Sequence, residues 1–418
     1  MLVKGVIPNK EPTISIGLVL PIDKQKSISI YSNIDDEKYE IKAVESNLSV
    51  NGQKRDQLSL EKTSNNSTFF LEPITAGRGF HWQKKISISV KGSLRVMVIS
   101  ESLFIVNEIG LESYLMSVAT SEMSGECPIS LLEAQTIAAR SWIIASEEQK
   151  HKELGIDACN DDCCQRYQGT KNISDSAQLA VNKTRGIFVT YNDEICDTRY
   201  SKSCGGISEN NENVWGDVPK EYLRSIFDNK RNNSIDLSYK NELQNWFLKP
   251  QESYCNNEHV NKNEIKKYLG SVDEEREYFR WQISYSHKEL TKIINDKLDE
   301  SFDSIVTLIP LKRGASGRIT KLEISGKRKD SLHKLILYNE YDIRDALHPK
   351  FLYSSAFIIN ANSNTLSDEE KITLSGGGWG HGVGLCQIGA LGMSLHGKSS
   401  KEILKHYFSS IKIERFYD

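Results

Sequence analysis

The sequence predicts an α+β protein, in which a β-rich N-terminal region precedes a core of helices and mixed strands. Apolar and polar residues alternate in several short runs before residue 106, which is the period of half-buried strands. Apolar residues then recur every three or four positions between residues 129 and 143, which is the period of a helix. At 418 residues the chain is long enough for two or three domains with cores of their own.

The first expected elements are strands at residues 13–16, 27–30 and 86–90. A helix around residues 111–118 follows, and a second helix begins at Pro128, a residue suited to a first helical turn. The apolar spacing of this second helix predicts about five turns that are packed on one face. Glu122 is expected on the connection between the two helices.

Strands and helices alternate in the rest of the chain. Two helices are expected to begin with capping boxes, formed by Ser286 with Glu289 and by Ser399 with Glu402. The expected elements are a strand at 186–191, a loop at 204–206, a strand at 279–283, a helix from 286, a hairpin of 305–311 and 319–324 that turns at 314–317, a strand at 371–374, a glycine-dense loop and two final helices.

These elements predict three regions. Residues 1–106 are expected to form the β-rich N-terminal region, and residues 107–244 and 346–418 a helical and mixed α/β core. Residues 245–345 are expected to form an inserted α+β segment.

Charge and hydropathy exclude two classes of protein. The formal net charge is −3 and the Lys and Arg residues are spread along the chain, whereas a nucleic-acid binder carries a concentrated basic face. The sequence contains no run of 18 apolar residues, so it predicts no membrane-spanning helix. The apolar run at residues 14–21 is short and typical of a strand, so we expect no secretory signal there. Either the chain is cytoplasmic or an export signal is absent from this sequence.

Glu122 is the strongest candidate for an acid catalyst. A single glutamate before a helix is usually a solvated charge, but Tyr114, Leu115 and Val118 precede this one. An apolar environment raises the pKa of a carboxyl, as a general acid near neutral pH requires. Arg140, 18 residues further on, could hold the carboxyl or bind anionic substrate groups. A close pair would lower the pKa again.

Residues 376–384 form a glycine-dense loop around Trp379 and His381, since six of these nine residues are glycine. Glycine allows positive φ and a close approach of the backbone to a ligand. Trp379 offers a flat surface of the kind on which sugars stack. A phosphate-binding loop is disfavoured because no Gly-Lys-Ser/Thr follows. The alternatives are a tightly packed turn and, for His381, a core histidine with its hydrogen bonds satisfied.

Three cysteines and one histidine lie close together in the sequence: His151, Cys159, Cys163 and Cys164. Zinc favours tetrahedral coordination by sulfur and nitrogen, so these residues predict a zinc site. Four protein ligands would close the coordination shell and leave no activated water, which makes the predicted metal structural. Disulfides are the alternative, and they become more favourable if the protein is exported.

Residues 200–206 and 213–216 contain a further candidate, Cys204. A nucleophilic cysteine needs a nearby base, for which His381 is available in the sequence. Cys204 could equally pair with Cys196 or Cys255, or be a packed cysteine in an ordinary loop.

Together these segments resemble the sporulation stage II protein D / LytB (SpoIID/LytB) family of bacterial cell-wall proteins. The resemblance extends from about residue 105 to 410, and the most specific blocks surround Glu122 and Trp379. The matching blocks are residues 121–123, 134–142, 164–169, 203–206, 213–216 and 378–390.

The resemblance implies a lytic transglycosylase that acts on peptidoglycan glycan strands, including strands already stripped of stem peptides. It implies Glu122 as the catalytic acid, Arg140 as a supporting residue and a location in the cell envelope. It also implies zinc in some members, bound by two histidines and two cysteines. Here Cys163 stands where a histidine is expected, so the predicted ligands are His151, Cys159, Cys163 and Cys164. The predicted substrate-binding residues are Tyr200, Lys202, Ser203, Cys204, Gly205, Trp215, Trp379, His381 and Gln387.

The chemistry of this reaction agrees with one prominent carboxylate. Hydrolases that invert or retain configuration use two carboxylates that flank the bond. A lytic transglycosylase can use one, because the C6 hydroxyl of N-acetylmuramic acid displaces the leaving group. Glu122 would protonate the glycosidic oxygen and then accept the hydroxyl proton, leaving a 1,6-anhydro end.

Three other functions stay open at this point. The first is a non-catalytic wall-binding module that stimulates a cell-wall amidase, as amidase enhancers of the family do. The second is a thiol enzyme that uses Cys204 or Cys386 with His381. The third is a zinc hydrolase, which would require an open coordination position on the metal.

Overall fold

The computed structural model describes residue 2 and residues 6–64, 66–79, 83–216, 218–230, 235–249, 251–256, 258–261, 263–270, 273, 277–329, 331–360 and 371–418. The chain forms two compact units. Unit 1 comprises Met1–Asp197, Lys266–Glu274 and Lys412–Asp418, and unit 2 comprises Thr198–Ile265 and Glu275–Ile411. The predicted α+β class with a β-rich N-terminus is confirmed. The three regions predicted from the sequence (1–106, 107–244 with 346–418, and 245–345) divide the chain differently from these two units, and they stay a prediction.

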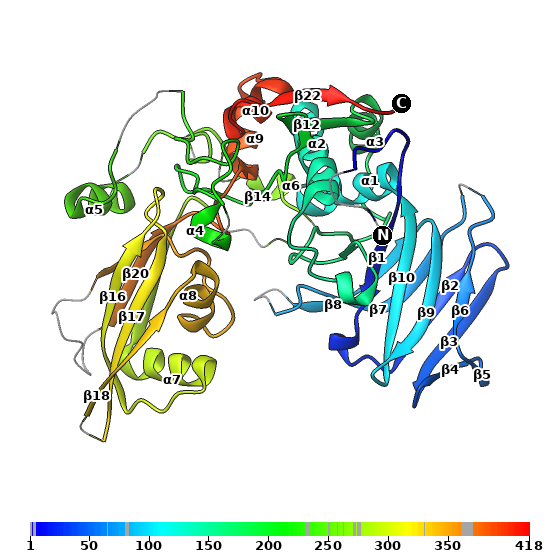
Figure 1. Ribbon diagram of the computed structural model, residues 1–418, viewed down its shortest axis with the longest axis horizontal. Coiled ribbons are helices and arrows are strands. Elements are labelled where there is room, and N and C mark those ends of the chain that lie inside the picture. Colours follow the sequence, from blue (N-terminus) through cyan, green and yellow to red (C-terminus); the bar gives the residue numbers. More distant parts are fainter. Residues whose placement is uncertain are drawn as a thin grey trace. The chain divides into compact units, whose positions relative to one another are not determined.

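The first part of unit 1 consists of two sheets that face each other (Figure 1). Contacts between β1 and β7 and between β4 and β9 join them. Along β2, Ile28 and Ile30 are buried and alternate with more exposed serines, as the period of two predicts. The five-stranded sheet has the order β11-β1-β10-β9-β6, namely Ala158–Cys159, Thr13–Val19, Ser102–Gly110, Ser93–Ile99 and Leu58–Leu60. The six-stranded sheet has the order β5-β4-β3-β2-β7-β8, namely Gln53–Arg55, Asn47–Val50, Glu37–Val44, Ser27–Ser32, Phe69–Ala76 and Lys84–Val90.

Three helices of unit 1 follow the strands β1 to β10 in sequence and pack on one another. α1 (Leu111–Glu122), α2 (Ile129–Ala145) and α3 (Asp175–Lys183) are in mutual contact. Every residue of α2 from Leu131 to Ile144 is buried, so the prediction that this helix packs on one face is wrong. The physical reason is that β12 and the other two helices cover it from several directions. The remaining elements are the 3-10 turns η1 (Pro21–Asp23) and η2 (Lys152–Leu154) and the sheet β13-β12-β22, namely Glu194–Ile195, Ile187–Tyr191 and Lys412–Arg415.

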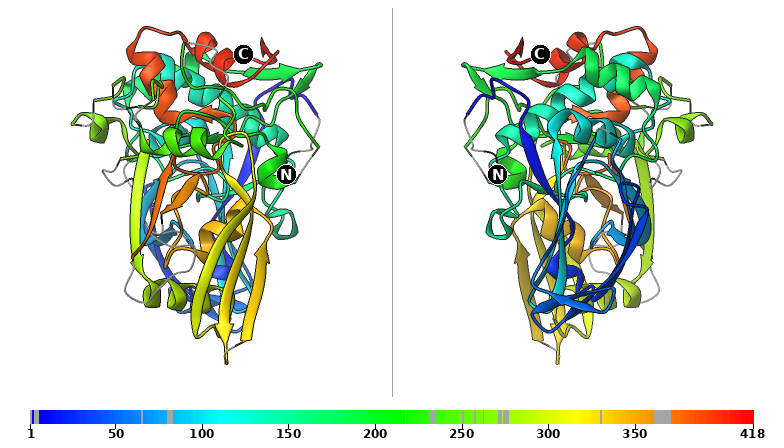
Figure 2. Two further views of the ribbon diagram at one scale, coloured as in Figure 1. Left: turned by 90° about the vertical axis from the view of Figure 1, so that its left-hand side faces the viewer. Right: turned by 90° about the vertical axis from the view of Figure 1, so that its right-hand side faces the viewer.

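Unit 2 contains two three-stranded antiparallel sheets with helices packed on them. Figure 2 shows the long yellow strands of one of these sheets, formed by residues 304–337, from two sides. The predicted hairpin is confirmed as β16 and β17, and the predicted capping box of Ser286 and Glu289 opens α7. The sheets are β15-β20-β19 (Arg280–Ser286, Lys371–Gly377, Phe357–Asn360) and β16-β17-β18 (Ser304–Arg313, Ile319–Arg328, Ser331–Leu337). α7 (His287–Leu298) and α8 (Glu340–Ala346) share their apolar core.

The other elements of unit 2 are short. β14 (Tyr200–Ser201) pairs in parallel with β21 (Leu385–Cys386), and the final helix begins with the predicted capping box of Ser399 and Glu402. The helices are α4 (Glu212–Trp215), α5 (Lys240–Leu248), α9 (Gln387–Leu395) and α10 (Ser400–Tyr407). The residues of α6 (Ile265–Tyr268) are divided in sequence between unit 2, which includes Ile265, and unit 1, which includes the rest. Among the described residues, no helix has the length and hydropathy required to cross a membrane.

Candidate functional site

Glu122 is the last residue of α1, not a residue of the connection after it. The side-chain hydroxyls of Thr120 and Ser121 donate to carbonyls one turn back in the helix, so these buried groups are satisfied within α1. The residue is 7% exposed, and its Oε1 accepts the backbone N–H of Arg166 at 3.0 Å. The predicted acid is therefore a buried carboxylate in a fixed position.

The segment of residues 165–169 holds this end of α1. Ser117 Oγ donates to the Gly169 carbonyl at 2.6 Å, and the N–H of Gln168 donates to Ser121 Oγ at 3.3 Å. Tyr114, earlier in the same helix, donates its hydroxyl to Gln165 Oε1 at 3.0 Å. These bonds align the segment with the helix, and they place the Arg166 N–H against the Glu122 carboxylate.

Arg166 is a residue of this site for which the sequence predicted no role. Its guanidinium forms ion pairs with Asp162 and, at 2.5 Å, with Asp273. Burial alone would lower the pKa of Arg166, but the charges of Asp162 and Asp273 raise that pKa well above its usual value. Arg166 lies inside the block 164–169 that matched the family, which was the available signal. Its distance in sequence from Asp273 concealed the ion pair.

Arg140 does not hold Glu122, so this expectation is wrong. Its fully buried guanidinium binds Glu112 with two hydrogen bonds, of 2.9 Å from Nε and 2.6 Å from Nη2. Its Nη1 donates to the Ile187 carbonyl at 3.1 Å. Glu112 and Glu122 lie at opposite ends of α1, roughly 15 Å apart along its axis. Sequence spacing could not decide which end of the helix Arg140 faces.

The four predicted zinc ligands come together in unit 1, and we name them cluster 1: His151, Cys159, Cys163 and Cys164. One ligand atom of each lies within 4.8 Å of all the others. Cys163 Sγ is 3.6 Å from His151 Nε2 and 3.0 Å from Cys159 Sγ. Tetrahedral zinc would separate a sulfur and a nitrogen ligand by about 3.6 Å. His151 fits this donor set, although its spacing in sequence is wide.

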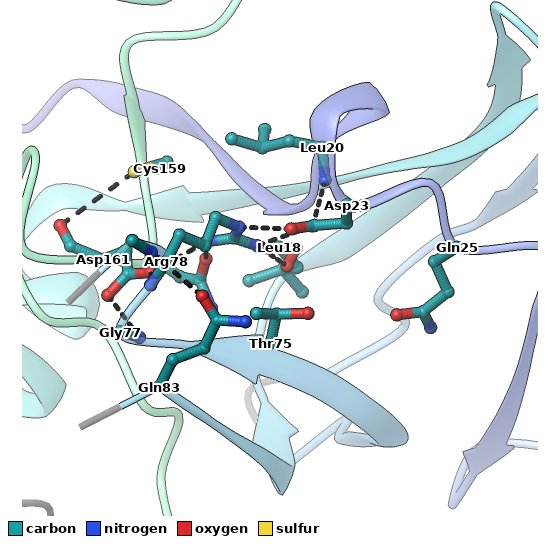
Figure 3. Close-up of polar contacts among 12 residues, drawn as sticks. Leu18, Leu20, Asp23, Gln25, Thr75, Gly77, Arg78, Gln83, Cys159 and Asp161 are labelled. Atoms are coloured by element: carbon teal, nitrogen blue, oxygen red, sulfur yellow. Dashed lines mark hydrogen bonds and ion pairs between the residues drawn. The ribbon is translucent and has the colours of Figure 1, made fainter. Parts of the chain in front are cut away.

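Arg78 supports the turn that carries cluster 1 (Figure 3). Its guanidinium binds both oxygens of Asp23, at 2.6 and 2.8 Å, and Asn160 Oδ1 at 2.7 Å. The backbone N–H groups of Gly77 and Arg78 both donate to Asp161 at 2.7 Å. Asp161 lies between the cysteines of the turn, so these bonds attach cluster 1 to the sheets of unit 1.

A cavity of about 410 Å³ reaches cluster 1. Cys163 and Cys164 line it together with Trp142, Lys150 and other residues of unit 1. His151, Cys163 and Cys164 are partly exposed, whereas Cys159 is buried. Small solutes can therefore approach three of the four side chains.

The predicted substrate-binding residues come together in unit 2. Ser203 and Trp379 exchange backbone hydrogen bonds of 2.7 and 3.1 Å, and the N–H of Ile388 donates to the Lys202 carbonyl at 3.0 Å. The parallel pairing of β14 with β21 continues this alignment. The loop of residues 200–206 and the glycine-dense loop are therefore neighbours.

Trp379 lies in an aromatic group that the sequence did not reveal. Its ring stacks on Tyr353 at 4.2 Å with an angle of 12°, and Tyr278 meets it edge-on at 5.0 Å. Tyr353 therefore covers one face of the indole. Trp379 nevertheless retains some accessible surface.

The surroundings of His381 favour a neutral imidazole. Burial, followed by the charges of Arg199 and Arg318, lowers its pKa well below the ordinary value. Its Nδ1 accepts the N–H of Val383 at 3.0 Å, so the proton of the neutral ring is on Nε2. Trp215 meets the His381 ring edge-on at 5.0 Å, so these two predicted substrate-binding residues are in contact.

Arg318 fixes the backbone of the glycine-dense loop. This fully buried guanidinium donates to the Gly380 carbonyl at 3.2 Å and the Cys204 carbonyl at 3.3 Å. A Cβ on Gly382 would lie 2.3 Å from Arg318 Cζ, and the φ of Gly382 is +75°. Only glycine fits there.

Burial divides the predicted substrate-binding residues. Tyr200, Trp215, Trp379 and His381 retain accessible surface. Lys202, Ser203, Cys204, Gly205 and Gln387 are buried. The Cys204 thiol lies next to Asp228, at 3.6 Å, and Cys255, at 3.8 Å. This environment suits a packed or ligating cysteine better than a nucleophile exposed to substrate.

Two family models match the chain. Residues 100–191, which include Glu122 and cluster 1, match the model described as "Stage II sporulation protein". Residues 209–384 match the model described as "Domain of unknown function (DUF8618)". The resemblance to the SpoIID/LytB family is thereby confirmed.

Individual proteins are similar to most of the chain. An uncharacterized protein of Brachyspira hyodysenteriae (strain ATCC 49526 / WA1) is 28% identical over 326 residues, which are 78% of this chain and 72% of the relative. Stage II sporulation protein D of Bacillus amyloliquefaciens is 25% identical over 325 residues, or 74% of this chain and 75% of the relative. The amidase enhancer of Bacillus subtilis (strain 168) is 25% identical over 302 residues, or 70% of this chain but only 39% of the relative.

Proposed function

We propose that the protein is a lytic transglycosylase, a carbon–oxygen lyase that cleaves peptidoglycan glycan strands at the cell envelope. The observation that carries this proposal is the buried Glu122 carboxylate at the end of α1, in the segment that matches the sporulation family. Strands stripped of their stem peptides are among the expected substrates.

In the proposed reaction Glu122 acts first as acid and then as base. Its proton passes to the glycosidic oxygen while the bond from C1 to that oxygen breaks. The C6 hydroxyl of N-acetylmuramic acid then bonds to C1 and returns its proton to Glu122, so no water is consumed. The N–H of Arg166 supports this role because it fixes the orientation of the carboxylate. Arg140 is a positioning residue, which holds α1 through Glu112.

We propose zinc as the metal of cluster 1, because the ligand atoms of three thiols and one imidazole converge within 4.8 Å of one another and Cys163 Sγ lies 3.6 Å from His151 Nε2. Zinc would move Cys159 Sγ and Cys163 Sγ apart from their present 3.0 Å. Zinc would supply a cross-link between the residues around His151 and the turn at Cys163. Because this turn leads directly into Arg166, the cluster would hold the segment that contacts Glu122.

The accessible aromatic residues of unit 2 are proposed to bind glycan. Trp379 and Trp215 retain accessible apolar surface that can contact sugar rings, although Tyr353 stacks on the first ring and Arg199 lies 4.2 Å from the centroid of the second. His381 packs edge-on against Trp215. The buried residues of the predicted set would support this surface rather than contact the sugar, namely Lys202, Ser203, Gly205 and Gln387.

The experiment compares Glu122→Gln with the wild-type protein on peptidoglycan, with and without prior amidase treatment. Products are analysed by mass for muramyl ends that have lost water. The variant should form these ends about 10²–10⁴ times more slowly, because the amide cannot transfer the proton. Glu126→Gln, at an exposed glutamate four residues on, is the matched control and should retain activity. Equal product formation by Glu122→Gln would overturn the proposal.

A second candidate function is stimulation of a cell-wall amidase. The similarity to a protein named amidase enhancer favours it. An amidase assayed with wild-type protein and with Glu122→Gln separates the two functions. Equal stimulation by both proteins, without anhydro ends from either, would establish the enhancer and exclude the transglycosylase.

A further inference from the structure

Unit 2 contains a second group of metal-ligating side chains, which we name cluster 2: Cys204, Asp228, Cys255 and Cys386. One ligand atom of each lies within 4.8 Å of all the others. The four residues are between 0 and 3% exposed. We propose that cluster 2 is a structural zinc site with three thiolates and one carboxylate.

The distances suit a tetrahedral ion. Cys204 Sγ is 3.8 Å from Cys255 Sγ and 3.6 Å from Asp228 Oδ2. Two thiolates on tetrahedral zinc lie about 3.8 Å apart, because each zinc–sulfur bond is about 2.3 Å long. The four side chains therefore surround a point that one ion could occupy with little rearrangement.

The surrounding backbone favours sulfur in its charged form. The N–H of Cys204 donates to Cys386 Sγ at 3.2 Å, and that of Gly206 donates to Cys204 Sγ at 3.3 Å. Cys386 is also the N-cap of α9, where its sulfur accepts the N–H of Gly389 at 3.3 Å. A thiol is a weak acceptor, whereas a metal-bound thiolate is a strong one. Three N–H groups directed at two sulfurs are thus the shell expected around a metal.

Asp228 provides the independent observation. Its carboxylate is fully buried, and burial of an isolated charge is costly unless a cation compensates it. Tyr407 donates to Oδ1 at 2.7 Å, while Ser253 Oγ and the N–H of Cys255 donate to Oδ2 at 3.1 Å. Such bonds orient a ligating carboxylate. A basic side chain, His406, also approaches this carboxylate, with its Nε2 3.6 Å from Oδ1.

A disulfide between two of these cysteines is the main competing arrangement. A disulfide would require an oxidant, and it would not explain why the third cysteine and Asp228 converge on the same point. The convergence of all four donors favours the metal. Bound zinc would join the loop after β14, the segments of residues 228 and 255 and the start of α9. It would thereby hold the Ser203 backbone that pairs with Trp379.

The experiment measures zinc per chain in the full-length reduced protein by elemental analysis. We expect two zinc ions in the wild-type protein, one in Cys255→Ala and one in Cys163→Ala, which lacks a ligand of cluster 1. Cys196→Ala removes a buried cysteine that belongs to neither cluster, and it should retain two ions. One ion in the wild-type protein and none in Cys163→Ala would overturn the proposal. So would a disulfide that includes Cys204, found by peptide mass analysis of protein isolated without reductant.

A measurement on the wild-type protein covers the case in which Cys255→Ala fails to fold. Cobalt is exchanged for zinc, and the sulfur-to-cobalt absorption is compared with that of Cys163→Ala. Two sites with three thiolates each predict that the wild-type protein shows about twice the absorption of this variant. Loss of the whole absorption in Cys163→Ala would contradict cluster 2. Neither measurement depends on glycan cleavage, so failure of the proposed function leaves this test intact.

Discussion

The two four-residue clusters have almost the same donors but opposite constructions. Cluster 1 draws its ligands from 14 consecutive positions, His151 to Cys164, whereas Cys204 and Cys386 of cluster 2 are 182 positions apart. Cluster 1 is partly exposed beside a cavity, and cluster 2 is buried at all four positions. The first can form from one loop, but the second exists only when unit 2 is folded.

The supports of the clusters differ in the same sense. The side chain of Arg78 and the carboxylate of Asp161 hold the turn of cluster 1. Cluster 2 is held by the backbone N–H groups of Cys204 and Gly389, which both donate to Cys386 Sγ, and by the Tyr407 hydroxyl, which donates to Asp228. We therefore expect a metal in cluster 1 to exchange readily with solvent and its affinity to depend on the supporting side chains. A metal in cluster 2 should exchange slowly and contribute to the stability of the core.

The largest expected effect is on the stability of unit 2. Cys255→Ala should lower the free energy of unfolding by about 3–5 kcal/mol, because loss of the proposed metal removes its charge compensation for the buried Asp228 carboxylate. Cys163→Ala should cost less, about 1–2 kcal/mol, because water can reach its neighbours. Denaturant unfolding followed by tryptophan fluorescence measures both. Equal losses would remove the distinction between a core site and a surface site.

The next prediction concerns the support of cluster 1. Arg78→Lys removes the paired hydrogen bonds to Asp23 and should weaken zinc binding at cluster 1 about 10–100-fold, as changes around metal ligands do. Competition with a chromophoric chelator measures this affinity. The zinc of cluster 2 serves as an internal control within the same sample. A weakened cluster 2 would show that Arg78 acts on stability in general.

Chelator kinetics provide a third and smaller contrast. Zinc should leave cluster 1 at least about ten times faster than cluster 2, equivalent to about 1.4 kcal/mol in barrier, because only cluster 1 is accessible. Stopped-flow chelation should show two phases of equal amplitude in the wild-type protein. The fast phase should disappear in Cys163→Ala. A single phase in the wild-type protein would mean that burial does not control release.

The smallest expected effect concerns His381, in the loop before Cys386. Because its pKa is lowered in the folded state, the unfolded chain takes up a proton near its ordinary pKa while the folded chain does not. Its contribution to stability is complete above about pH 6.5 and is lost as the pH falls below that value. His381→Asn retains an acceptor for the Val383 N–H but does not titrate. Unfolding measured at about pH 7 and 5 should show a smaller loss of stability in this variant. An unchanged loss would mean that other groups account for it.

Local residue patterns determined much of the fold. The capping boxes at Ser286 and Ser399 and the hairpin of β16 and β17 depend on neighbours a few positions away, so spacing alone predicted them. Cluster 1 belongs to this class, since one turn brings Cys159 and Cys163 together. The motif around Glu122 is equally local, and its residue types and spacing were enough to indicate the family.

Only the tertiary structure decided the partners of residues that are far apart in sequence. It paired Arg140 with Glu112, buried α2 on all sides, placed Tyr353 on the Trp379 ring and assembled cluster 2. The physical reason is the same in each case. Helical and strand periods specify which face of an element is apolar, but they do not specify which other segment covers that face. A buried charge or thiol takes its chemistry from that covering segment, so Cys204 changed from a possible nucleophile into a proposed metal ligand.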